Sequence, residues 1–333
     1  MGDDTRYAYA VARVRGMETR LLDRQWVERL LSETAEGALK ALADSAYQEA
    51  VSEIGRPEEI EEGLRRALAA TLTELSAIAP EPALVDLFRL RWDFRNLKSL
   101  LKASLLKLED ETAGVAAGPG TIDAAALARA VRDRDYTMLP KPLAEAAREA
   151  EERYRDESVL SVIDRVIDGA LWRHSFEVAS EHRNTFLVDY LRTEIDLSNI
   201  KTFVRAKESG RDETDLAAAL LVGGRLDLSL FTSHLGEPVD AFARAIEYGP
   251  YGALAEVFRD WSRDRSHLLE LACDNLLLRK VEGGAMEAYG VEPLVSYILQ
   301  RQIEIKLVRT AILAKLDGVE RGEVEARLRS IHV

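Results

Sequence analysis

Apolar residues between positions 83 and 108 recur at steps of three and four residues, which is the spacing of one face of an α-helix. The members of this stripe are Leu87, Leu90, Phe94, Leu97, Leu101 and Leu108. Asp93 and Asn96 lie on a neighbouring stripe. The pattern predicts one long amphipathic helix with a polar pair beside its buried face.

The polar positions of this helix recur further along the chain. At a spacing of 103 residues, Asp196, Asn199 and Lys201 match the first set, and 108 residues later Glu304 and Arg309 continue it, with Leu307 in place of asparagine. The eight repeated polar residues are Asp93, Asn96, Lys98, Asp196, Asn199, Lys201, Glu304 and Arg309. Two interpretations stay open for them: hydrogen bonds that fix the register between units, or groups that line a shared central space.

The period of about 100 residues predicts three copies of one helical unit. We place them at 1–110, 111–212 and 213–333, with the N-terminal segment a candidate to pack with the third unit. Each unit opens with an apolar residue followed by Asp, and Asp is a good helix N-cap. The three pairs are Leu22-Asp23, Ile122-Asp123 and Leu226-Asp227, the last two preceded by Gly120 and Gly224.

Composition predicts the fold class and argues against nucleic acid and the lipid bilayer as partners. The chain is rich in Ala, Leu, Glu and Arg with only 9 Pro in 333 residues, so we expect a nearly all-α protein. The net charge of −13 and the absence of a Lys/Arg cluster argue against nucleic acid. No stretch approaches the roughly 20 apolar residues that span a bilayer. We therefore expect a soluble cytoplasmic protein with no direct bilayer span.

Signatures of catalysis are scarce. Neither a Walker-type phosphate loop nor a G-x-G-x-x-G segment after a strand occurs. His174 and His182 lie eight residues apart, which is wider than zinc sites usually require, and the single cysteine, Cys273, has no adjacent base in the sequence. We expect no catalytic residues, no cofactor and no metal site.

Three segments carry a family resemblance. The N-terminal Y9-A-V-A-R-V-R15, the two helices D93-F-R-N-L-K98 and D196-L-S-N-I-K201, and the threefold plan resemble the C subunit of the A/V-type rotary ATP synthases, called the d subunit in eukaryotic V-ATPases. The resemblance covers essentially the whole chain.

The resemblance implies a hollow, funnel-like body of three similar helical domains around a pseudo-threefold axis. Such a protein is a non-catalytic socket on the cytoplasmic face of the membrane. It joins the central stalk to the proteolipid ring and transmits the torque that couples ATP synthesis or hydrolysis to ion transport. The Asp/Asn pairs would then fix the angles between the domains. The alternative is a free-standing α-solenoid adaptor unrelated to a rotary motor.

Overall fold

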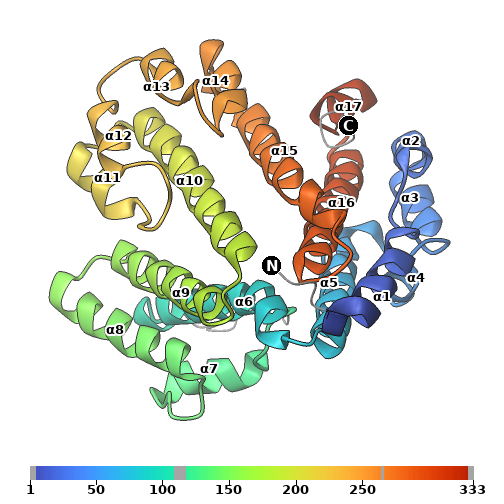
Figure 1. Cartoon of the computed structure of the whole chain (residues 1–333), viewed down its shortest axis with the longest axis horizontal. Helices are drawn as coiled ribbons and strands as arrows, with labels where there is room; N and C mark the ends of the chain where they lie inside the picture. The colour runs from blue at the N-terminus through green and yellow to red at the C-terminus, as the bar shows by residue number, and fades with distance from the viewer. Residues whose placement is uncertain (1–4, 109–117, 264–265, 329–333) are drawn as a thin grey trace. The chain divides into compact units, whose positions relative to one another are not determined.

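The computed structural model describes residues 5–108, 118–263 and 266–328 (Figure 1). All the regular structure of these residues is helical, with no strand among them, which confirms the predicted all-α class. The chain separates into two compact units. The terminal unit combines Met1–Val85 with Glu237–Val333, and the central unit is Asp86–Gly236. The three units expected from the sequence stay a prediction, and the boundary at residue 110 lies outside the described residues.

The terminal unit is organised around its longest helix, α16 (Glu292–Leu316). This helix packs against helices from both ends of the chain, and buried residues occur around most of its circumference. A helix that is apolar on most sides is typical of the centre of a core. The other helices are η1 (Thr5–Tyr7), α1 (Ala8–Glu18), α2 (Arg24–Ser32), α3 (Ala35–Leu42), α4 (Gln48–Val51), η2 (Pro57–Glu59), α5 (Ile60–Ile78), α13 (Val239–Ile246), α14 (Gly252–Arg259), α15 (Ser266–Ala285) and α17 (Arg321–Leu328).

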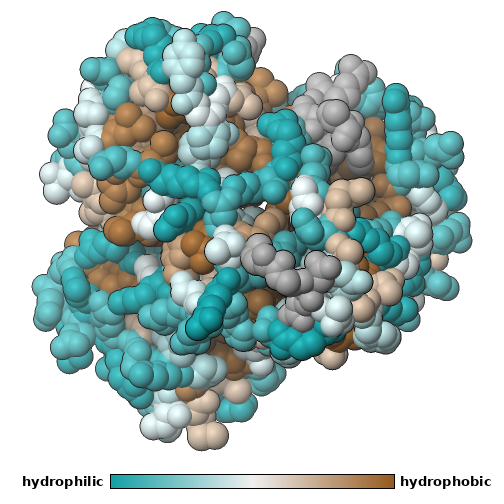
Figure 2. Space-filling view, in the orientation of Figure 1, coloured by the Kyte–Doolittle hydropathy of each residue, from teal (hydrophilic) through white to brown (hydrophobic). Residues whose placement is uncertain are grey.

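The central unit contains the first two repeated helices, α6 and α10. Its helices are α6 (Pro82–Leu105, whose first residues belong to the terminal unit), α7 (Ala124–Asp133), α8 (Lys141–Glu157), α9 (Ser161–Glu181), α10 (Thr185–Glu208), α11 (Glu213–Ala219) and α12 (Leu228–Ser233). Phe94, Leu97 and Leu101 of the α6 stripe are buried with residues of α7, α8 and α9 in one core cluster. The outward surface of α8, at the lower left of the view, is almost entirely hydrophilic (Figure 2).

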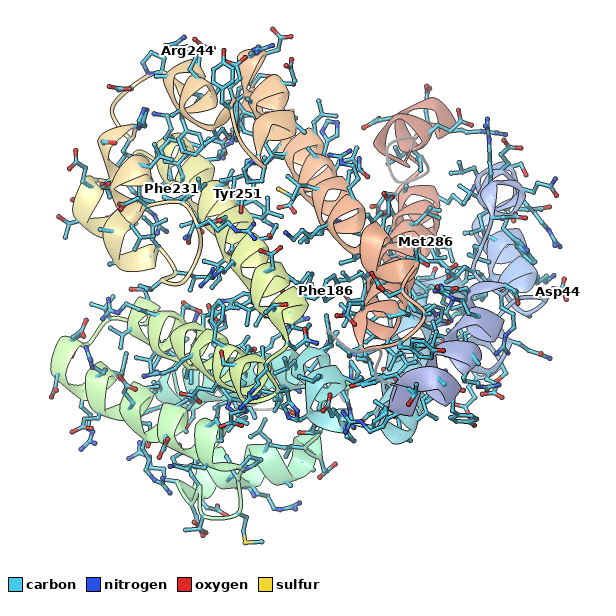
Figure 3. The ribbon with its side chains drawn as sticks, in the orientation of Figure 1. Asp44, Phe186, Phe231, Arg244, Tyr251 and Met286 are labelled. Atoms are coloured by element: carbon cyan, nitrogen blue, oxygen red, sulfur yellow. The ribbon has the colours of Figure 1, made fainter. Side chains whose placement is uncertain are left out.

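Aromatic residues pack together near the C-terminal end of α10. Phe231, on α12, is fully buried and lies 6.1 Å from the ring of Phe203 on α10, centroid to centroid (Figure 3). Met286, which directly follows the C-terminal end of α15 in the terminal unit, is 85% exposed (Figure 3).

The helix predicted over 83–108 ends earlier than the pattern indicated. Lys107 adopts a left-handed backbone with φ of 53°, and the Leu108 N–H donates to the Ala103 carbonyl at 3.1 Å. This bond is the C-terminal closure of a Schellman-type end. Leu108 is therefore outside the helix and half exposed, and its assignment to the buried stripe was wrong.

None of the helices in the described residues is long and apolar enough to cross a membrane.

Candidate functional site

The first buried carboxylate, Asp93 of α6, binds the segment that opens the second sequence repeat. Its Oδ2 accepts from the Thr121 backbone N–H at 2.9 Å and from the Thr121 hydroxyl at 2.7 Å. Its Oδ1 accepts from the Ile122 N–H at 3.1 Å. Asp93 is fully buried, so these donors replace its hydration.

Asp196 of α10 makes the same contact one repeat later. It is fully buried and accepts from the backbone N–H of Arg225 at 2.9 Å and of Leu226 at 3.1 Å. Ile122 and Leu226 are the apolar members of the pairs that open the second and third repeats. Both carboxylates thus bind the corresponding backbone group of the repeat that follows.

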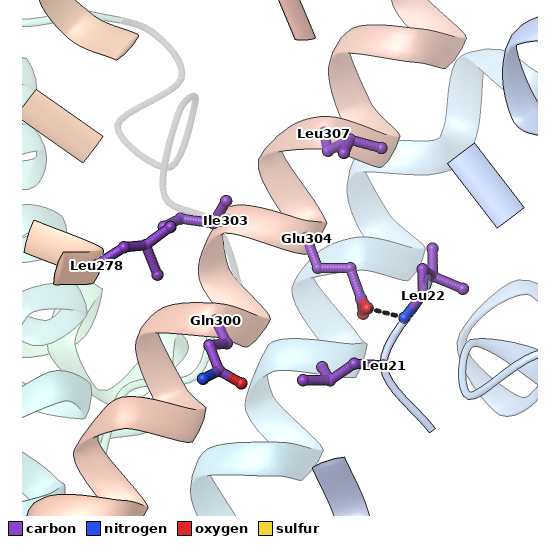
Figure 4. A pocket seen from close by; sticks show the side chains of 7 residues that line it. All are labelled: Leu21, Leu22, Leu278, Gln300, Ile303, Glu304 and Leu307. Carbon is purple, nitrogen blue, oxygen red and sulfur yellow. Dashed lines mark hydrogen bonds between the residues drawn. The ribbon is translucent and has the colours of Figure 1, made fainter. Parts of the chain in front are cut away.

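Glu304 of α16 completes the series within the terminal unit. Its Oε2 accepts from the backbone N–H of Leu22, the apolar residue that opens the first repeat (Figure 4). We call each of these three contacts an acid clasp: the carboxylate of a repeated helix bound to the first apolar residue of a repeat. Each contact joins residues that belong to different repeats predicted from the sequence.

The residue after each clasped amide caps the next helix, as predicted. Side-chain oxygens of the three aspartates accept from the backbone N–H of Trp26, Ala126 and Ser229 at 3.0, 2.9 and 2.8 Å. The capping residues are Asp23 for α2, Asp123 for α7 and Asp227 for α12. Each short helix is therefore fixed at its N-terminus by its own cap and by an acid clasp.

Glycine makes room for the two aspartate clasps. A Cβ on Gly120 would lie 2.2 Å from Asp93 Oδ1, and one on Gly224 would lie 2.0 Å from Asp196 Oδ1. The corresponding residue before Leu22 is Arg20, and there the acid is Glu304, longer by one methylene. A longer acid thus accompanies the segment that carries a side chain.

The asparagine position explains why the third copy differs. Asn199 Nδ2 donates to the Leu221 carbonyl at 2.8 Å, and its Oδ1 accepts from the Leu221 N–H at 2.8 Å. Asn96 is buried at the matching position of α6. The residue that corresponds to Leu221 in the first repeat is Met17, whose carbonyl already accepts from Thr19 and Arg20 at the end of α1.

The Met17 carbonyl is therefore paired without an amide donor from the third repeated helix. Leu307 instead lines a cavity of about 140 Å³ next to Glu304. The other lining residues are Leu21, Leu22, Leu278, Gln300 and Ile303 (Figure 4).

Two of the three basic members of the set, Lys98 and Arg309, bind acidic residues at equivalent positions of two long helices. Lys98 Nζ lies 2.8 Å from Asp168 Oδ1 and 3.6 Å from Asp164, both on α9. Arg309 Nε lies 2.5 Å from Glu61 on α5, and Glu61 is the sequence equivalent of Asp164. Lys201 lies half-buried on α10.

Sequence reasoning missed two lysines that act on the same short helices. Lys207 Nζ donates to the carbonyls of His234 and Leu235 after α12 at 3.2 and 2.6 Å. Lys315 Nζ donates to the carbonyls of Leu31 and Glu33 at the end of α2 at 2.9 and 2.5 Å. An ammonium group stabilises the unpaired carbonyls of a helix C-terminus. The sequence did carry a signal for this pair, because Lys207 and Lys315 are separated by the same 108 residues as the repeated helices.

A second missed contact joins equivalent positions of α6 and α10. Arg91 Nη1 lies 2.7 Å from Glu194 Oε1, and its guanidinium lies 5.1 and 5.5 Å from the ring centroids of Phe88 and Trp172. Burial opposes the charge of Arg91, but Glu194 and Tyr190 together outweigh this effect and raise the pKa of the guanidinium. Arg91 therefore keeps its charge at ordinary pH values.

The pKa values of two aspartates of the site are shifted in opposite directions from their ordinary value. Burial raises the pKa of Asp93 against the hydrogen bonds from Thr121, whereas the Ser229 side chain and backbone lower the pKa of the exposed Asp227. We expect carboxyl-detected NMR to show Asp93 losing its proton at higher pH than Asp227. Asp93 then contributes stability below its unfolded pKa that is lost as pH rises through the folded value, and Asp227 contributes stability that is lost as pH falls. The reverse order of midpoints would contradict this assignment.

No group of three or more His, Cys, Asp or Glu side chains in the described part of the chain has the geometry of a metal site. His174 Nδ1 lies 3.6 Å from Glu177 on the same helix, and Cys273 is buried.

The fold and these contacts define a class: an all-helical protein in which acidic residues at equivalent positions of three long helices bind the start of short helices. The sequence matches the model of the ATP synthase (C/AC39) subunit family over residues 10–327, and the chain belongs to that family.

Named relatives agree with this assignment along nearly their whole length. The C subunit of the A-type ATP synthase of Thermococcus kodakarensis is 25% identical, over 95% of this chain and 88% of the relative. Its counterpart in Thermococcus onnurineus is 28% identical, with the same two coverages of 95% and 88%. The C subunit of the V-type sodium ATPase of Enterococcus hirae is 21% identical, over 96% of this chain and 97% of the relative.

Proposed function

We propose that the protein is a non-catalytic central-rotor subunit of an A/V-type ATP synthase. In this role it is a socket at the cytoplasmic face of the membrane that joins the central stalk to the proteolipid ring and transmits torque between them. Family membership supports the assignment, and the relatives are named as subunits of ATP synthases and of a sodium ATPase.

The observation that carries the proposal is the recurrence of the acid clasp. A rotor component that transmits torque must keep the angles between its repeats constant. Hydrogen bonds to a buried carboxylate suit this task because they are directional and stronger than bonds between neutral groups. The same contact at Asp93, Asp196 and Glu304 supports the interpretation that the polar set fixes register between repeats. The pseudo-threefold, funnel-like arrangement stays a prediction.

The free-standing solenoid adaptor is less well supported. In a solenoid each repeat contacts only its neighbours along the chain. Glu304 in the last repeat binds Leu22 in the first, and α16 packs against α1, α2, α3 and α5. A contact between the first and last predicted repeats is not expected of a solenoid.

Purified components test the proposed function directly. The protein should co-purify both with the proteolipid ring and with the central-stalk subunits of its own complex. Omitting it should abolish ATP-driven ion transport, while the soluble ATPase motor continues to hydrolyse ATP. A well-folded protein that binds neither partner, or a soluble motor that needs it for hydrolysis, would contradict the proposal.

A further inference from the structure

The three acid clasps differ in how the chain connects their two sides. Asp93 and Ile122 are 29 residues apart, and Asp196 and Leu226 are 30 apart, but Glu304 and Leu22 are separated by 282 residues. For a flexible chain the probability of closure falls with the 3/2 power of loop length, which makes the last contact roughly thirtyfold less favourable. The clasp at Glu304 thus joins two segments whose connection along the chain is too long to keep them close to each other.

Two further side chains act on the carboxylate at this clasp. The Tyr47 hydroxyl donates to Glu304 Oε1 at 2.8 Å, and Arg301 forms an ion pair with the same oxygen. The Arg301 guanidinium also lies 4.0 Å from the centroid of the Tyr47 ring. All three side chains are buried. Tyr47 belongs to the first repeat and the other two to the third, so the cluster crosses the joint.

The other two repeated helices have no cation at this position. Arg301 corresponds to Thr193 on α10 and to Leu90 on α6. On the three repeated helices, an arginine thus stands at this position only beside Glu304, the clasp whose two sides are far apart in the chain.

Stability alone is a poor explanation for this buried pair. Replacing a buried ion pair by well-packed apolar residues is often neutral or stabilising. Moreover, Arg301 Nε is buried with no acceptor among the described residues. Beside the pair, the cavity of about 140 Å³ is lined from both sides of the joint, by Leu21 and Leu22 and by residues of α15 and α16. Beside Glu304, apolar packing leaves this cavity unfilled, and the polar contacts of the carboxylate orient it there.

We propose that Arg301 and Tyr47 are positioning residues that hold the Glu304 clasp closed under torque, in place of the short chain connection present at the other two clasps. The proposal rests on the rotary function proposed above. Arg301 orients the Glu304 carboxylate toward the Leu22 amide, and Tyr47 prevents the carboxylate from turning away when the first and third repeats are pulled apart.

The test uses the full chain with the substitutions R301M and Y47F. The matched control is R89M, because Arg89 donates to the carbonyls of Pro119 and Gly120 at the Asp93 clasp, where the chain connection is short. Hydrogen exchange on the isolated chain reports the clasp through the Leu22 amide. Loss of a hydrogen bond to a charged group should speed exchange at Leu22 about tenfold or more in both variants. Residues 121–133 act as an internal reference, and their exchange should not change.

The second measurement is ion transport per ATP in the reconstituted complex against an increasing opposing ion gradient. R301M and Y47F should assemble and hydrolyse ATP like the wild type, but should lose coupling several-fold at high gradient, whereas R89M should not. Unchanged exchange at Leu22, equal acceleration at 121–133, or unchanged coupling under load would overturn the proposal. If R301M fails to fold, Y47F decides alone. Wild-type protein that binds neither ring nor stalk would instead refute the rotary function itself.

Discussion

Replacing Asp196 by alanine should lower the free energy of unfolding of the central unit by about 3–5 kcal/mol, one of the largest effects expected of a single side chain here. The carboxylate is fully buried and accepts from the amides of Arg225 and Leu226. The substitution leaves both amides without an acceptor and opens a space at the start of α12. Urea unfolding followed by circular dichroism measures the change.

Asp227 provides the matched control. It is also an aspartate that accepts a backbone N–H at the start of α12, but it is exposed. D227A should cost only about 1 kcal/mol, as N-cap removal usually does. Equal losses in D196A and D227A would show that the acid clasp adds nothing beyond an ordinary cap.

The G224A substitution should destabilise the central unit by about 2–4 kcal/mol, because its new methyl group would overlap the carboxylate of Asp196 and displace it from its donors. The added Cβ would lie 2.0 Å from Asp196 Oδ1 and 3.2 Å from a methyl carbon of Ile195. The same urea titration measures the loss, together with increased amide exchange at Leu226.

Gly169 offers a control of opposite sign. It lies within α9, and a Cβ there would meet nothing within 4 Å. G169A should be neutral or stabilise the helix by up to about 1 kcal/mol. A double-mutant cycle isolates the clash, since most of the G224A penalty should disappear in a D196A background. Full additivity of the two substitutions would place the effect of G224A elsewhere.

The sequence predicted what local chemistry determines. The all-α class followed from composition, the three caps at Asp23, Asp123 and Asp227 from the preference of helix starts for aspartate, and the long helices from apolar periodicity. The end of α6 was misplaced because an apolar leucine at position 108 continues the stripe in sequence, while the left-handed Lys107 ends the helix. The periodicity of apolar residues does not reveal where the backbone changes from the right-handed to the left-handed helical conformation.

The partners of the polar set could not be predicted in the same way. Helical periodicity places Glu304 beside a buried stripe, but only the packing of α16 against the first repeat brings it to the Leu22 amide, 282 residues away. The pairing of Arg91 with Glu194 lay in the same 103-residue spacing that matched the repeats. The spacing identifies equivalent positions, and equivalence alone does not say that two such positions touch.

Among relatives, the two sides of each acid clasp are expected to change together. Aspartate binds the amide where the residue two positions earlier is glycine, as at Gly224, and glutamate binds it where that residue is Arg20. The longer acid thus occurs beside the larger loop residue. In an alignment of homologues, Asp at the acid position should occur with Gly in the loop, and Glu should occur with a larger loop residue. The two positions should therefore covary.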